Sequence, residues 1–186
     1  MATKIYIDQG HNPENPNAGA EGNGLLEQNI TYRVGEALAE LLRQNPDYEV
    51  RLSRPTPTTS LGNSNSTSLR ARVDDANAWG ADYFISIHTN ASENPQAQGV
   101  EAFSYSRPSR AFSLGEDLVE NLSAATGFPN RGMKTRPGLY VLRRTNMPAV
   151  LVEIGFISNP EEAALMDSNP ALFARGLYNG IIEYFE

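Results

Sequence analysis

Segments with the apolar periodicity of strands and of helices alternate along the whole chain of 186 residues. This alternation is typical of an α/β domain with a mostly parallel sheet. We therefore predict a single domain over residues 1–186, with a mostly parallel central sheet of about six strands and helices on both faces. The expected strands are 4–8, 48–53, 83–88, 99–105, 139–142 and 149–156, and the expected helices are 27–44, one capped at Thr67 or Ser68, 111–125, one starting at Pro160, and 171–184.

One long segment has neither periodicity. Residues 53–68 are polar, include two prolines and are predicted to form a loop. A structureless stretch of this length is unusual inside a compact domain and is often functional. A plain connector explains the same composition equally well, so both interpretations stay open.

The overall composition excludes several classes of function. A net charge of −7 and a pI of about 4.9 disfavour a nucleic-acid binder, which usually has a basic face. The chain has no cysteine, so any metal must be held by histidine and carboxylate groups. No apolar run approaches the roughly 20 residues that span a bilayer, and the N-terminus lacks a signal-peptide pattern. We expect no nucleic-acid partner, no membrane span and no signal peptide in this chain.

The only two histidines both follow or end a predicted strand. His11 lies just past the first strand, and His88 ends the strand at 83–88. Because the carboxyl ends of parallel strands meet at one edge of a sheet, the two residues can lie together there. Glu27 is the first residue of the next helix, which starts from the same edge of the sheet. Two imidazoles and one carboxylate form a common catalytic zinc site. Taken singly, each histidine is more often structural, and Glu27 is a helix-start acid that complements the helix dipole.

A fourth candidate, Glu153, lies inside the strand "AVLVEIGF". An acid between apolar neighbours is costly unless it is paired or used in chemistry. A salt-bridged core acid explains the position as well as a catalytic one does.

Four motifs, in order, resemble the zinc-dependent N-acetylmuramoyl-L-alanine amidases of the type 3 family, cell-wall hydrolases of sporulation and phage lysis. "IYIDQGH" ends at His11, "GLLEQN" contains Glu27, and "ADYFISIHTNA" contains His88 and Asn90. "MPAVLVEIGFISNPEEA" contains Glu153, and "SLRARVDDAN" and "NRGMK" are also similar to family segments. The resemblance covers nearly the whole chain.

The resemblance implies hydrolysis of the amide between N-acetylmuramic acid and L-alanine in peptidoglycan. It implies Zn²⁺ on His11, Glu27 and His88, with Glu153 as the catalytic residue that moves the proton. Its implied setting is the bacterial cell wall or extracellular space, or the cytoplasm until release if the protein is phage-derived. An activating protein partner is compatible with it.

Three further residues are candidate substrate contacts. Asn90 is expected to contact either the substrate or one of the residues that bind the metal. Arg131 or Lys134 of "NRGMK" is expected to meet carboxylates of the peptide, although ordinary surface charge explains both equally well.

The chain departs from the family pattern at the first histidine. The family usually has Gly-His-Gly-Gly there, whereas this chain has Gly10-His11-Asn12-Pro13, preceded by Gln9 where proline is common. Neither change removes a ligand. Two alternatives remain: a zinc peptidase that acts on the stem peptide, and an inactive wall-binding module. A serine hydrolase is disfavoured because the chain has no Gly-x-Ser-x-Gly motif.

Overall fold

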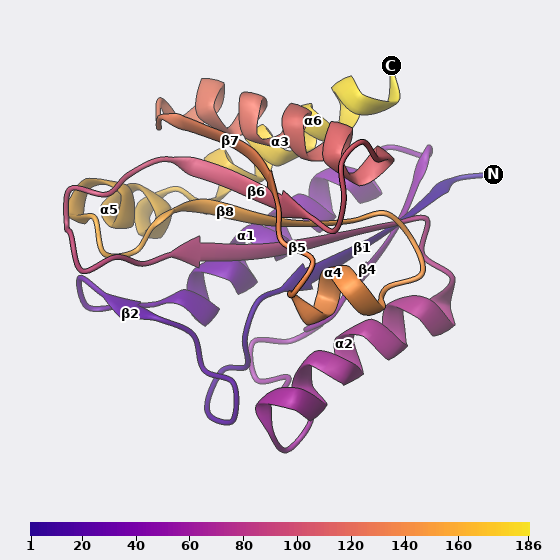
Figure 1. The fold of residues 1–186 in the computed structure, drawn as a ribbon, viewed down its shortest axis with the longest axis horizontal. Coiled ribbons are helices and arrows are strands. Elements are labelled where there is room, and N and C mark those ends of the chain that lie inside the picture. The colour runs from indigo at the N-terminus through magenta and orange to yellow at the C-terminus, as the bar shows by residue number, and fades with distance from the viewer.

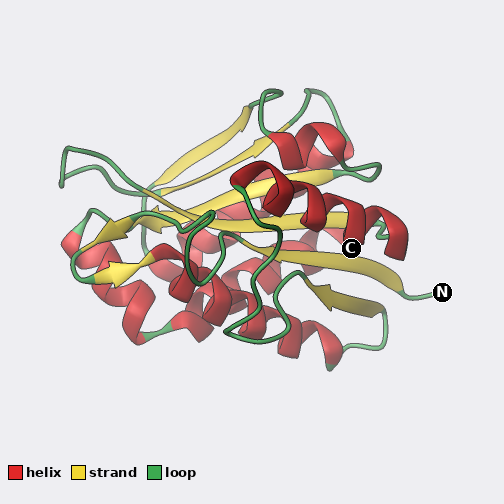
Figure 2. Cartoon of the chain, turned by 90° about the horizontal axis from the view of Figure 1, so that it is seen from below, coloured by secondary structure: helices red, strands yellow, loops and turns green.

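The computed structural model describes residues 1–186 as one α/β domain built on a six-stranded sheet (Figures 1 and 2). The strand order is β4-β1-β5-β8-β6-β7, and only the β6–β8 pair is antiparallel. The predicted mostly parallel sheet of about six strands is therefore confirmed. The strands are β1 (Thr3–Gln9), β4 (Tyr48–Leu52), β5 (Tyr83–Asn90), β6 (Val100–Ser104), β7 (Asn130–Thr135) and β8 (Ala149–Phe156), with a separate small hairpin of β2 (Glu21–Gly22) and β3 (Leu25–Leu26).

Helices cover both faces of the sheet. One face packs on α1 (Glu27–Arg43), α3 (Arg110–Thr126) and α6 (Pro170–Phe185), and the other on α2 (Asn65–Trp79) and the short α4 (Tyr140–Arg144). The remaining helix, α5 (Pro160–Ser168), follows β8. Both termini lie at the end of the molecule opposite the arrowhead of β5 (Figure 1). None of the helices has the length and apolar character needed to cross a membrane.

Alternation along β5 explains where the functional face lies. Ile85 and Ile87 enter the larger core under α1, α3 and α6, whereas Phe84 enters the smaller core under α2 and α4. Because alternate residues of a strand share a face, His88 lies on the same face as Phe84. The smaller core contains 10 buried residues against 26 in the larger one, and His88, on the same face of β5, is only partly buried.

One predicted strand is wrong. Residues 139–142 are not a strand, because Tyr140–Arg144 forms α4, whose Val141 and Leu142 enter the smaller core. A run of four apolar residues does not distinguish a strand from a helix. The strand of the central sheet that the periodicity missed is β7, a polar edge strand with no fully buried residue, and the two short strands of the hairpin, β2 and β3, were not predicted either.

The predicted loop at 53–68 is shorter than expected, because α2 begins at Asn65. Ser64, not Thr67 or Ser68, is the N-cap: its hydroxyl accepts the Thr67 backbone N–H, and the Thr67 hydroxyl accepts the Ser64 N–H. This reciprocal capping box begins the helix within a polar sequence. Because the first turn of α2 is polar, the apolar periodicity does not show where the helix begins.

Candidate metal centre and active site

The carboxylate of Glu27 joins the only two histidines of the chain. Glu27 Oε2 lies 3.2 Å from His11 Nε2, and Oε1 lies 3.1 Å from His88 Nδ1. The three residues offer ligand atoms that all lie within 4.8 Å of one another. The structure therefore brings together the three residues that the sequence suggested as metal ligands.

The Glu27 carboxylate is held in its ionised form. Its oxygens accept the backbone N–H groups of Ala20, at 2.9 Å, and Thr89, at 3.0 Å. Burial opposes ionisation, but the hydrogen bonds and charges of His11 and His88 outweigh it and lower the pKa of Glu27 far below its ordinary value.

This donor set fits a metal ion. Two imidazoles and one ionised carboxylate converge, which is the ligand chemistry of a catalytic zinc site with an open position. His11 presents Nε2 to the Glu27 carboxylate, and its Nδ1 is buried without a hydrogen-bond partner in the protein. The two imidazoles are 22% and 18% exposed, so the group is accessible to an ion and to a reacting molecule.

A hydrogen-bonded chain behind His88 fixes the orientation of its ring. His88 Nε2 lies 3.1 Å from the Ser86 hydroxyl, which donates to Asp8 Oδ2 at 2.7 Å. Because the hydroxyl proton is directed to Asp8, Ser86 accepts the Nε2–H of His88. When the ring is neutral, Nδ1 is then the nitrogen without a proton, which is the tautomer that metal binding at Nδ1 requires; when the ring is protonated, Nδ1–H donates to Glu27 Oε1.

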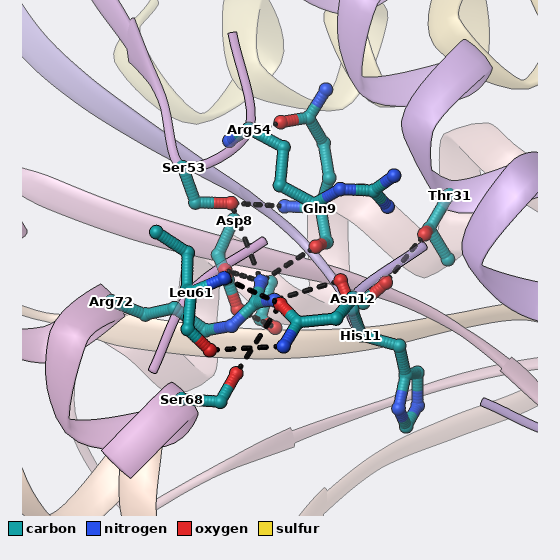
Figure 3. Close-up of polar contacts among 12 residues, drawn as sticks. Asp8, Gln9, His11, Asn12, Thr31, Ser53, Arg54, Leu61, Ser68 and Arg72 are labelled. Carbon is teal, nitrogen blue, oxygen red and sulfur yellow. Dashed lines mark hydrogen bonds and ion pairs between the residues drawn. The ribbon is translucent and has the colours of Figure 1, made fainter. Parts of the chain in front are cut away.

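Arg72 holds the loop that carries His11 (Figure 3). Its Nη1 donates to Asp8 Oδ1 and to the Gln9 carbonyl, both at 2.7 Å, and its Nη2 donates to the His11 carbonyl at 2.7 Å. His11 has a φ of +69°, a left-handed conformation that is costly for a non-glycine residue. The bond from Arg72 to its carbonyl stabilises this conformation, and the ring points away from the buried network.

The departures from the family pattern have structural partners. Asn12 is fully buried, and its amide donates to the carbonyls of Pro16, at 2.8 Å, and Leu61, at 2.9 Å. Its oxygen accepts the Leu61 N–H at 3.0 Å. The Gln9 side chain accepts the backbone N–H of Arg54 at 2.9 Å. These bonds tie the segment before α2 to the loop of His11, so this segment supports that loop in addition to connecting β4 to α2.

Two glycines allow the close approach of these elements. A Cβ at Gly10 would lie 2.5 Å from His88 Cε1, and a Cβ at Gly19 would lie 2.8 Å from Glu27. Any larger residue at either position would displace one of the three converging side chains.

A small cavity of about 130 Å³ opens beside the group. It is lined by His11 and His88, by Leu151 of β8 and by Leu139 and Tyr140 at the start of α4. A group that enters this cavity meets both imidazoles.

Glu153 lies next to the converging residues. It is aligned with His88 across the β5–β8 pair, and its Oε2 is buried without a hydrogen-bond partner. Burial raises the pKa of Glu153 to about 7; the charges of Glu27 and Glu101 act in the same direction, and those of His88 and Arg136 oppose it. A carboxyl with this pKa can both accept and donate a proton near neutral pH.

Asn90, Arg131 and Lys134 meet at one residue that the sequence analysis missed, Glu101 of β6. The Asn90 amide donates to Glu101 Oε1 at 2.7 Å, Lys134 Nζ donates to Oε2, and Arg131 Nε lies 3.6 Å from Oε2. Glu101 is aligned with Glu153 across the antiparallel β6–β8 pair. The available signal was an acid within an otherwise apolar strand, the same signal that singled out Glu153.

Comparisons with known proteins agree with this fold and site. The sequence profile of the Amidase_3 family, described as N-acetylmuramoyl-L-alanine amidase, matches residues 5–183, so the chain belongs to this family. The N-acetylmuramoyl-L-alanine amidase CwlM of Bacillus licheniformis is 37% identical over 186 residues, covering 98% of this chain and 68% of the relative.

Two solved structures are similar over almost their full length. The CwlD amidase of Clostridioides difficile, in complex with the GerS lipoprotein, has a TM-score of 0.90 and 27% identity, covering 98% of both chains. The catalytic domain of CwlV, an N-acetylmuramoyl-L-alanine amidase of Bacillus (Paenibacillus) polymyxa var. colistinus, has a TM-score of 0.85 and 31% identity, also covering 98% of both. These TM-scores show that both proteins share the fold of this chain.

Proposed function

We propose that residues 1–186 form a catalytic domain that hydrolyses the amide between N-acetylmuramic acid and L-alanine in bacterial cell-wall peptidoglycan, with Zn²⁺ as cofactor. Family membership supports the bond that is cleaved. The observation that carries the mechanism is the unpaired oxygen of Glu153, aligned with His88 beside the His11–Glu27–His88 group. The bacterial cell wall is then where the enzyme acts.

His11, Glu27 and His88 would hold the ion. When bound there, Zn²⁺ supplies a Lewis acid that polarises the amide carbonyl and acidifies water. Asp8 and Ser86 keep the His88 ring in the required tautomer, and Arg72 keeps the His11 loop in its left-handed turn. These residues provide a preformed set of ligands.

Glu153 is assigned the proton transfers. Its carboxylate accepts a proton from the attacking water, whose oxygen bonds to the carbonyl carbon. The same carboxyl then gives this proton to the amide nitrogen as the carbon–nitrogen bond breaks. The products are a free carboxylic acid on the muramic acid and a free amino group on L-alanine.

Asn90, Arg131 and Lys134 are assigned to the substrate side of the site together with Glu101. Glu101 fixes the Asn90 amide and both cations within one cluster, next to Glu153. A protein partner is also part of the proposal, because the similar CwlD structure is a complex with the GerS lipoprotein.

The first test separates chemistry from metal binding. Glu153→Gln should keep a full equivalent of zinc by elemental analysis and lose hydrolysis of purified peptidoglycan by about 10³-fold or more, because proton transfer is lost. Glu161→Gln, at an exposed position of α5, is the matched control and should stay active. Full activity of Glu153→Gln would contradict the role of Glu153.

The second test addresses the metal and the bond that is cleaved. His11→Ala and His88→Ala should each lose the zinc, and retention of a full equivalent would refute the ligand set. Mass spectrometry of fragments released by the wild type should show free L-alanine amino groups and intact glycan. Fragments cut within the stem peptide would instead identify a peptidase, and the absence of fragments would identify a binding module.

A further inference from the structure

Positive charge is concentrated in one segment of this acidic chain. Residues 121–152 contain five of the fifteen Lys and Arg residues and none of the 22 Asp and Glu residues, although the whole chain has a net charge of −7. We call residues 121–152 the basic segment. It includes β7 and α4 and runs up to Glu153, the proposed proton carrier. The cations of the basic segment are Arg131, Lys134, Arg136, Arg143 and Arg144.

Two cations of the basic segment are already paired within the protein. Lys134 Nζ and Arg131 Nε both approach one oxygen of Glu101. One carboxylate therefore faces two cations, and neither of these side chains is a free charge at the surface. The cluster still carries a net positive charge.

Arg136 differs, because no carboxylate lies within 4 Å of its guanidinium and its side chain makes no hydrogen bond within the protein. Its guanidinium carbon lies 5.1 Å from the centre of the Phe103 ring, and the residue is exposed. The backbone N–H of Arg136 donates to the Ser104 carbonyl at 2.8 Å, which keeps the chain beside β6 past the end of β7. The aromatic face supports the guanidinium through a cation–π contact and leaves its N–H donors free.

The position of Arg136 relates it to the site. Phe103, under its guanidinium, pairs with Leu151, which is two residues before Glu153 on the same face of β8. Leu151 and Leu139, the latter three residues after Arg136, both line the cavity of His11 and His88. Arg136 is also near enough to Glu153 for its charge to favour ionisation of that carboxyl.

We propose that Arg136 is a specificity-determining residue that binds a free carboxylate of an acidic stem peptide while Glu153 faces the scissile amide. This inference rests on the proposed amidase function and adds the feature of the peptide that is selected. A guanidinium binds a carboxylate through two parallel charge-assisted hydrogen bonds. A carboxamide has no charge and offers only one acceptor oxygen, so the enzyme discriminates against peptides whose carboxylate is amidated.

The experiment uses the zinc-loaded chain and two synthetic N-acetylmuramoyl-L-alanyl peptides. They differ only in whether the second residue carries a free carboxylate or the corresponding carboxamide. The wild type should cleave the acid with a kcat/KM about tenfold higher than that for the amide, as one charge-assisted pair provides. Arg136→Gln should bring this ratio close to one by raising the KM of the acid, with the kcat/KM of the amide changed less than about twofold.

Two control variants test whether the preference for the free carboxylate depends on the guanidinium of Arg136. Arg136→Lys should keep part of the preference, because it keeps the charge but not the planar fork. Arg143→Gln, in the last turn of α4, removes an exposed arginine of the same segment and should leave the ratio unchanged.

Three results would overturn the assignment. The wild type could cleave both peptides equally, Arg136→Gln could keep the wild-type ratio, or Arg131→Gln or Lys134→Gln could abolish the ratio while Arg136→Gln does not. Each of these leaves an active amidase, so the proposed function survives. No release of peptide from either substrate by the wild type would instead refute the proposed function and the inference with it.

Discussion

The two halves of the functional edge are built on opposite principles. Over β1 and β5, the charged groups are buried and paired: the side chains of Asp8 and Arg72 are 2% and 1% exposed and joined at 2.7 Å. Over β6, β7 and β8, Glu153 has an unpartnered oxygen, and the exposed Arg136 next to β7 has no acidic partner within 4 Å. The first half fixes the geometry of the three proposed metal ligands, whereas the second half has charged groups without partners in the protein, which the proposed function assigns to the substrate.

This difference has an energetic counterpart. Removing one member of a buried ion pair leaves the other charge without compensation, which costs about 3–5 kcal/mol. An exposed ion pair contributes about 0–1 kcal/mol. Substitutions in the two halves should therefore separate into those that unfold the protein and those that change its chemistry.

The largest expected effect on stability is in the half over β1 and β5, where the charges are buried and paired; we call it the paired half and the other the unpaired half. Arg72→Ala should lower the free energy of unfolding by about 3–5 kcal/mol, because Asp8 loses its buried partner and the His11 loop loses its support. Arg70→Ala, an exposed arginine of the same helix, should change it by less than about 0.5 kcal/mol. Urea denaturation measures both, and similar values for the two variants would remove the contrast between the halves.

In the unpaired half, the contribution of Glu153 to stability should depend on pH. Its pKa is about 7 in the folded protein against 4.5 for the free side chain, so the folded state disfavours the ionised form. The resulting cost to stability is absent below pH 4.5, grows as the pH rises, and is complete above pH 7.

Glu153→Gln should therefore stabilise the metal-free protein on the order of 2 kcal/mol at pH 8, and much less at pH 5. Thermal or chemical denaturation at the two pH values measures the difference. A variant that is equally stabilised at both pH values, or destabilised at pH 8, would show that Glu153 is not held in this state.

Ser86 sharpens the comparison at the boundary between the halves. Ser86→Ala removes the acceptor that orients the His88 ring, so zinc affinity should fall about tenfold. Competition with a chelator measures this affinity. Ser104→Ala removes another fully buried hydroxyl, on β6, and should leave zinc affinity unchanged. Equal zinc affinity of Ser86→Ala and the wild type would mean that Ser86 does not position the ligand.

The smallest expected effect on stability is at β7. Lys134→Gln should change the free energy of unfolding by no more than about 1 kcal/mol, because the pair with Glu101 is partly exposed and Asn90 and Arg131 remain beside the acid. Urea denaturation in low and high salt measures it. A loss as large as that of Arg72→Ala would show that the cluster around Glu101 is a structural element like the paired half.

The sequence predicted those parts of the molecule that have a local signature. The apolar segments around β1, β5 and β8 predicted the sheet. The two histidines at the ends of predicted strands indicated which edge of the sheet carries the candidate site. The polar edge strand β7 has no such signature, and the short apolar run of α4 fits either kind of element. Asp8 and Arg72 are separated by 64 residues, so no local sequence pattern predicts their pairing. The role of Glu101 depends on the antiparallel entry of β6 beside β8, which strand periodicity does not encode.

The position of β8 sets the order in which this protein can become active during its synthesis. This last strand of the chain lies between β5 and β6, and not at an edge of the sheet. Residues 1–90 already contain His11, Glu27 and His88, whereas Glu153 arrives only when β8 inserts between strands made earlier. Since folding on the ribosome proceeds from the N-terminus, a nascent chain has the proposed metal ligands before the proposed proton carrier. Residues up to β8 must therefore be made before the proposed proton transfers can take place at this site.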